Sequence, residues 1–123
     1  MSAIQQLLLA TGGELAATAP VNTVVPAISG ATTVGSTLST TDGTWTGSPT
    51  PTYGYQWKRG GTNISGATAN TYLLDVADLA ATITVTVTAT NASGSDSATS
   101  AGVGPVTGSS TNYTATYLSQ GIY

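Results

Sequence analysis

The stretch that decides the fold is TITVTVTATN, residues 82–91, in which apolar and polar side chains alternate strictly. Ile83, Val85, Val87 and Ala89 take the odd positions, and threonines take the even ones. Successive side chains of a strand point to opposite faces, so this pattern predicts a strand with one face on a core and the other in water. The middle of the chain is therefore expected to be β-structure.

Other segments of the chain repeat this two-residue period. In TYGYQWK, residues 52–58, it places Trp57 and two tyrosines on one face, with Lys58 on the other. This aromatic run beside the chain's two basic residues is compatible with a binding surface or with the centre of a β-sandwich. Leu38 in STLST and Leu74 in TYLL are expected to point inward in the same way.

Turn-forming residues separate the predicted strands at short, regular intervals. Strands bounded by turns every 8–12 residues or so indicate a sandwich or a barrel, and no long helical period competes with this reading. The turn signals are Ser29-Gly30, Asp42-Gly43, Gly47-Ser48-Pro49, Gly60-Gly61, Ser65-Gly66 and Asn91-Ala92-Ser93-Gly94.

The composition excludes several classes of partner. Charged residues make up 6% of the 123 residues, and the net charge is −3 with only two cations, Lys58 and Arg59. Two positive charges cannot neutralise a run of phosphates, so neither nucleic acid nor an anionic membrane surface is expected as a partner. The chain has no cysteine, which suggests folding in a reducing compartment. A surface this poor in charge suits a protein that sits in an assembly.

The chain divides into three parts by composition. Residues 1–20 form an expected N-terminal docking arm, with a short helix from Ser2 to about Thr11 that ends at the Gly12-Gly13 pair. Residues 21–107 carry the strand and turn signals, and residues 108–123 form a C-terminal tail. The apolar run in the arm is too short to span a membrane, and no basic residue precedes it, so we expect neither membrane insertion nor an export signal.

Residues 28–100 resemble the immunoglobulin-like domains of bacterial surface proteins and phage virion proteins. The resemblance rests on the ordered motifs SG…G-x-TL, GTW-x-G-x-P-x-P, YQW-x-R, I-x-GAT-x-x-TY, D-x-AD and ITV-x-VTATN-x-x-G. It implies an immunoglobulin-like β-sandwich in which Trp57 is buried at the centre rather than exposed. The core residues expected on this basis are Leu38, Trp57, Leu74, Ile83, Val85 and Val87.

The chain departs from antibody-type domains at two positions of the long strand. Val85 stands where those domains carry a cysteine, and Ile83 stands where they carry the tyrosine whose hydroxyl braces a corner. We therefore expect no corner hydroxyl, and expect the turn before the strand to depend on Asp75 or Asp78.

The residues offer little for catalysis. Histidine and cysteine are absent, serines and threonines have no base at a recognisable spacing, and the acids do not form a glycosidase or calcium-loop pattern. We expect no enzymatic activity, no cofactor and no metal. Trp45, in GTWTGSP, either stacks on a sugar ring or covers the edge of the sandwich.

The two ends carry the predicted docking residues. The arm presents Ile4, Leu7 and Leu8, and the tail presents Tyr113, Tyr117 and Tyr123. With the resemblance, this favours a phage virion accessory protein, assembled in the host cytoplasm, whose partners are other virion proteins and further copies of itself. We lean towards head decoration with an outward sandwich that stabilises the particle or adheres weakly to glycans. A tail or fibre component and a bacterial surface adhesin module are the alternatives.

Overall fold

The computed structural model describes residues 16–109, and in this range the chain is nearly all β with antiparallel sheets, as the sequence predicts. The predicted arm helix and the docking residues Ile4, Leu7, Leu8, Tyr113, Tyr117 and Tyr123 lie outside the described residues. The elements are β1 Thr18–Val24, β2 Ile28–Ser29, β3 Thr37–Thr40, β4 Thr44–Ser48, β5 Thr52–Arg59, β6 Thr62–Asn63, β7 Thr71–Leu73, the 3-10 turn η1 Val76–Asp78, β8 Ile83–Asn91 and β9 Gly94–Thr99.

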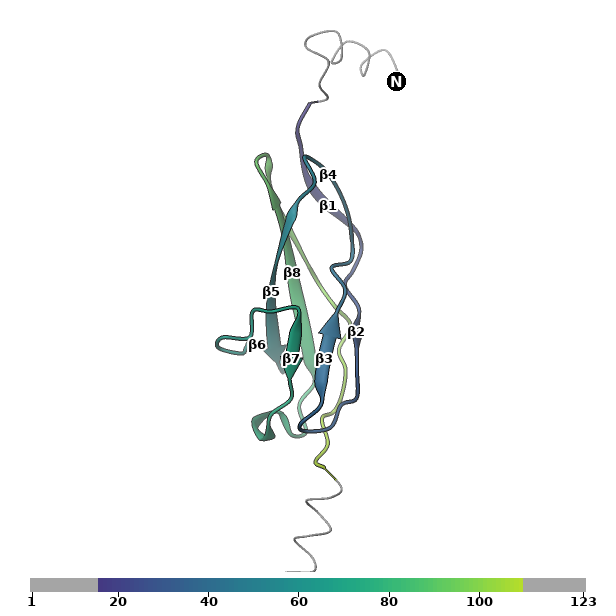
Figure 1. Cartoon of the computed structure of the whole chain (residues 1–123), viewed down its shortest axis with the longest axis vertical. Coiled ribbons are helices and arrows are strands. Elements are labelled where there is room, and N and C mark those ends of the chain that lie inside the picture. The colour runs from purple at the N-terminus through teal and green to yellow at the C-terminus, as the bar shows by residue number, and fades with distance from the viewer. Residues whose placement is uncertain (1–15, 110–123) are drawn as a thin grey trace, which may run out of the picture.

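The strands form three antiparallel groups, ordered β6-β5-β8-β9, β2-β3-β7 and β1-β4. The longest ladder joins β5 to β8 from Thr52↔Thr90 to Arg59↔Ile83, and it places Trp57 opposite Val85. The core lies between this four-stranded sheet and the β2-β3-β7 sheet, because buried side chains from both meet there. The result is an elongated, sandwich-like body in which β5 and β8 run along the long axis (Figure 1).

The β1-β4 pair extends the body beyond the three-stranded sheet (Figure 1). β1 also lies against the β8-β9 hairpin: the Asn22 amide donates to Asp96 Oδ2 at 3.1 Å, and Asn91 Nδ2 donates to the Thr18 carbonyl at 2.8 Å. Because β1 begins at Thr18, residues 18–20 belong to the sandwich and not to the arm, so the predicted boundary at residue 20 lies inside a strand.

The core contains the side chains that the alternation indicates. Trp57 has no exposed surface, its neighbours in the core include Leu38, Leu74 and Val85, and its indole N–H donates to the Ala69 carbonyl at 2.8 Å. Trp57 is therefore at the centre of the sandwich and not on a binding surface, whereas the two tyrosines of the run, Tyr53 and Tyr55, are only half-buried. The predicted residues Leu38, Trp57, Leu74, Ile83, Val85 and Val87 are all buried, and Ala89 and Val106 are buried with them.

The predicted Asp42-Gly43 turn joins β3 to β4, and its backbone requires glycine. Gly43 has φ +83°, in the left-handed region, and a Cβ there would collide with the Val24 carbonyl. The loop is thereby held against the end of β1. Asp42 is fixed close to Trp45, and the two residues together shape part of the surface at this end of β4.

The chain enters and leaves the described body at opposite poles of its long axis (Figure 1). β1 starts beside the β8-β9 hairpin at one pole. At the other, Thr107 lies beside residues 32–34, where its amide donates to the Thr32 carbonyl and its carbonyl accepts from the Val34 amide, both at 2.9 Å. The full length of the body therefore separates the point where residue 16 enters it from the point where residue 109 leaves it.

Candidate functional site

Three polar side chains from separate elements meet at the corner before β8, and we call Arg59, Tyr72 and Asp78 the corner cluster. Arg59 Nε, at the end of β5, donates to Asp78 Oδ1 at 2.6 Å, and the Tyr72 hydroxyl, on β7, donates to Asp78 Oδ2 at 2.8 Å. Asp78 has no exposed surface. A buried carboxylate needs such partners because desolvation of an unpaired charge costs several kcal/mol or more.

The corner cluster is continuous with the turn η1. The Asp75 amide donates to Asp78 Oδ2 at 2.8 Å, and Asp75 Oδ1 accepts from the Val76 amide at 2.6 Å, so the two aspartates cap the turn reciprocally. The turn therefore depends on Asp75 and Asp78 together. The expectation that no hydroxyl braces this corner is wrong, because the Tyr72 hydroxyl on β7 bonds to Asp78.

Opposing effects set the ionisation of the corner cluster. Burial by itself raises the pKa of Asp78, but the hydrogen bonds from the Asp75 amide, Tyr72 and Arg59 outweigh it and hold that pKa below its usual value. The bond to Asp78 raises the pKa of Arg59, and burial raises the pKa of Tyr72, as does the bond to Asp78. Both carboxylate oxygens of Asp78 are engaged, so the cluster fastens the turn to β5 and β7 and presents no reactive group.

A second group of side chains surrounds Trp45 on β4, and we call Trp45, Tyr53, Tyr55 and Asp42 the Trp45 patch. The Trp45 ring is half-buried, its N–H donates to the Asp42 carbonyl at 2.7 Å, and its centroid lies 6.3 Å from that of Tyr53 at an interplanar angle of 43°. The Tyr55 hydroxyl donates to Asp42 Oδ1 at 2.5 Å. This bond to the carboxylate, with burial, raises the pKa of Tyr55 to about 12.

The geometry of the Trp45 patch fits both readings of Trp45. The tilted contact with Tyr53 and the internal N–H bond make the ring a cover for the edge between β4 and β5. The part of the ring that is exposed could still stack on a sugar, because an aromatic face adds apolar contact without needing the N–H. Glycan binding therefore stays a prediction for this patch.

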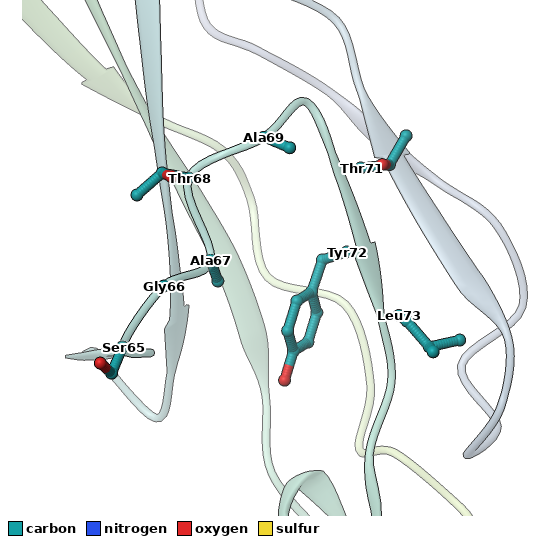
Figure 2. A pocket seen from close by; sticks show the side chains of 8 residues that line it. All are labelled: Ser65, Gly66, Ala67, Thr68, Ala69, Thr71, Tyr72 and Leu73. Carbon is teal, nitrogen blue, oxygen red and sulfur yellow. The ribbon is translucent and has the colours of Figure 1, made fainter.

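A shallow groove of about 240 Å³ lies between β7 and the loop that joins β6 to β7, and we call it the β7 groove (Figure 2). The Tyr72 ring points into the space between the loop and β7, and small residues of the loop form the opposite side. Sequence reasoning missed this groove, because the motif I-x-GAT-x-x-TY indicates a hairpin without showing how far its loop stands from the strand. The lining residues are Ser65, Gly66, Ala67, Thr68, Ala69, Thr71, Tyr72 and Leu73.

Within residues 16–109 no group of three or more acidic, histidine or cysteine side chains is placed to hold a metal ion. Nor does that part of the chain contain a helix long and apolar enough to cross a membrane. Every buried side-chain nitrogen or oxygen in the described body has a hydrogen-bond partner.

Comparison with known proteins gives no relative from which to transfer a site. No family model, no curated protein and no solved structure matches this chain. A function for this protein therefore has to be inferred from its own residues.

Proposed function

We propose that the protein is a non-enzymatic structural component of a phage virion, in which the sandwich decorates the head and stabilises the particle or adheres weakly to surfaces. The observation that carries the proposal is that the polar side chains with altered pKa values bond to neighbouring side chains of the fold. Asp78 bonds to Arg59 and Tyr72 at the corner, and Tyr55 bonds to Asp42, so these groups hold the body together, as a structural component requires.

The two poles of the body support a role in assembly. The chain enters and leaves the body at opposite ends of the long axis (Figure 1). A partner bound by the residues before the body is therefore kept apart from a partner bound by the residues after it. A decoration protein needs one end on its lattice and a rigid body that projects from it. In this proposal residues 1–17 dock on the capsid, assembly takes place in the host cytoplasm, and the partners are capsid subunits and other copies of the chain.

The resemblance to immunoglobulin-like domains of virion proteins adds support to the proposal. The antiparallel sandwich and buried Trp57 are compatible with it. Sandwiches of this kind serve many purposes, so the fold alone favours no location on the particle.

Immunogold electron microscopy on particles and cells of the source tests the proposal directly. Uniform label over the heads is the expected result. Label confined to tails or fibre tips would move the protein to host attachment, and label on cells without label on particles would contradict a virion role and favour a surface adhesin.

A matched pair of full-length variants then tests the docking arm. Changing Ile4, Leu7 and Leu8 together to serine should abolish incorporation into particles, because it removes the apolar face that the sequence predicts. Changing Gln5 and Gln6 to serine alters the same segment without touching that face, and should leave incorporation unchanged. Equal incorporation of the two variants would exclude this arm as the anchor.

The Trp45 patch is the one observation that favours the second candidate, a tail, fibre or adhesin module that binds glycans. It holds a half-buried indole beside a tyrosine ring on the surface of the body. Retention of the protein on a glycan array, lost in Trp45→Ala with the fold intact, would support it, and unchanged retention would remove it.

A further inference from the structure

The strand β7 has one side with no partner in the described structure. It is the last strand of the β2-β3-β7 sheet and pairs with β3 alone, with Leu38 opposite Tyr72. The Thr40 amide donates to the Asn70 carbonyl at 3.0 Å, and the Leu74 amide donates to the Ser36 carbonyl at 2.9 Å. The groups that face β3 are therefore those of residues 70, 72 and 74.

In an antiparallel ladder the residues between the bonded ones turn their backbone groups the other way. On β7 these are Thr71 and Leu73, whose N–H and C=O groups point away from β3. Among residues 16–109 no backbone or side-chain group bonds to them outside the ladder. An open edge of this kind is a template for another strand.

The surroundings of this edge leave room for such a strand. The β7 groove runs along it, with Tyr72 on one side and Ala67 in the loop opposite (Figure 2). The Leu73 side chain is 61% exposed beside the same edge, so a leucine and two unpaired peptide groups occupy adjacent surface. Covering them would remove apolar area from water and pair the backbone at once.

We propose that the open edge of β7 takes residues 112–118 of a second copy of this chain as an added strand. That segment, NYTATYL, lies outside the described residues, and its sequence has the composition of a strand. Its two-residue period places Tyr113, Ala115 and Tyr117 on one face and Asn112, Thr114, Thr116 and Leu118 on the other. The aromatic face suits the β7 groove, and the face with three polar residues suits water.

The position of the chain's exit assigns the strand to a neighbouring copy. Thr107 lies against residues 32–34, and these come after β2, which pairs with the side of β3 that faces away from β7. On its other side the exit is bonded to the segment that follows η1, since the Val106 carbonyl accepts from the Ala80 amide, so the chain leaves at the pole beyond the end of β7 (Figure 1). To lie along β7 of the same copy, residues 112–118 would have to turn back at this pole, whereas the tail of a second copy can approach the edge from outside.

This inference is independent of the proposed virion role. It concerns contacts between copies of the purified chain, so its failure would leave the particle-labelling result untouched. Failure of the labelling experiment would likewise leave the contact between copies untouched. If both hold, strand exchange between neighbours would connect copies on the particle.

Hydrogen exchange on the full-length chain tests the proposal. The variant Thr114→Pro with Thr116→Pro keeps the chain length but cannot pair as a strand, because proline lacks the amide hydrogen. In the unaltered chain at high concentration the Thr71 and Leu73 amides should exchange at least about tenfold more slowly than in this variant. The Leu74 amide, bonded to Ser36, is the internal control and should exchange equally in both.

Dilution and a variant of the β7 edge distinguish the tail of a second copy from the tail of the same copy. Protection of Thr71 and Leu73 should disappear on dilution by roughly a hundredfold, since a second copy dissociates by mass action. Leu73→Lys should also abolish it, whereas Val21→Lys, at a residue 55% exposed on β1, should not. Equal exchange in the unaltered chain and the proline variant would overturn the proposal. Protection that survives dilution would overturn it too, by placing the tail on its own copy.

Discussion

The two tryptophans of this protein have similar contacts and different surroundings. Each indole N–H donates to a backbone carbonyl, Trp57 to Ala69 at 2.8 Å and Trp45 to Asp42 at 2.7 Å. Each ring also lies beside a tyrosine, with centroids 5.7 Å apart for the pair at Trp57 and 6.3 Å apart for the pair at Trp45. Yet Trp57 has no exposed surface, and Trp45 is half-buried at the edge of β4.

The local contacts of an indole therefore do not determine its role. Trp57 lies on the inner face of the four-stranded sheet beside Val85 of the neighbouring strand, and it packs in the core with Leu38 of the facing sheet. Trp45 keeps part of its surface exposed. Changes to each ring, or to the polar groups around it, should have effects on stability that decrease from the core outward.

Trp57→Ala should have the largest effect, a loss of about 4 kcal/mol in the free energy of unfolding. The substitution removes the largest buried side chain and leaves a cavity between the sheets. Urea denaturation followed by far-ultraviolet circular dichroism measures the loss. Trp57→Phe keeps an aromatic ring but loses the bond to Ala69, so its stability should lie between those of the unaltered chain and Trp57→Ala. If Trp57→Ala lost no more stability than Trp45→Ala, the difference between the two tryptophans would be contradicted.

Arg59→Met should cost about 3 kcal/mol at neutral pH, because it leaves the Asp78 carboxylate buried without its cation. Lys58→Met on the same strand changes the net charge equally and is the control, with little effect expected. The folded-state pKa of Asp78 is lowered, so its contribution is present above the unfolded pKa of about 3.9 and is lost as pH falls through the folded value. The difference in the free energy of unfolding between the unaltered chain and Arg59→Met should therefore decrease in acid. A difference that does not depend on pH would argue against the charge pair.

Trp45→Ala should cost about 1.5 kcal/mol, because only part of the ring is buried and one hydrogen bond is lost. The same denaturation experiment measures it. A cost equal to that of Trp57→Ala would show that Trp45 also belongs to the core. A small cost with loss of glycan retention would assign the exposed part of the ring to binding.

Tyr55→Phe should have the smallest effect, about 1 kcal/mol, and a distinct pH dependence. The folded pKa of Tyr55 is about 12, above the ordinary tyrosine value of about 10, so the stabilisation is complete below pH 10 and is lost as pH rises towards 12. Ultraviolet absorbance reports tyrosine ionisation on alkaline titration. The ionisation step near pH 12 should be missing from the variant, and an unchanged titration would exclude the bond to Asp42.

The sequence predicts the centre of this fold better than its corner. Val85 can be deduced from the two-residue period, because burial of alternate residues is a property of each strand on its own. For Trp57 the period gives only the face of the strand, and its burial is expected from the resemblance. The corner cluster joins Arg59, Tyr72 and Asp78 from three elements, and no local pattern sets the register that brings them together. The expected arm boundary at residue 20 failed for the same reason, since Thr18 belongs to β1 through its pairing with a distant strand.

The two candidate surfaces, the Trp45 patch and the β7 groove, also differ in how far the sequence predicts them. GTWTGSP identifies Trp45 as an aromatic near a turn, and the structure adds the contacts with Asp42 and Tyr53 that fix the ring. The β7 groove has no sequence signature. It depends on which side of β7 faces β3, and this pairing becomes visible only in three dimensions.

The opposite placement of residues 16 and 109 has a mechanical consequence (Figure 1). Tension between the two poles acts along the strands, whereas the hydrogen bonds of antiparallel pairs lie across them. Pulling on β1 therefore loads its bonds to β4 in shear, so that several must break together before the strand can slide. A body connected in this way would transmit force from one end to the other as a stiff link.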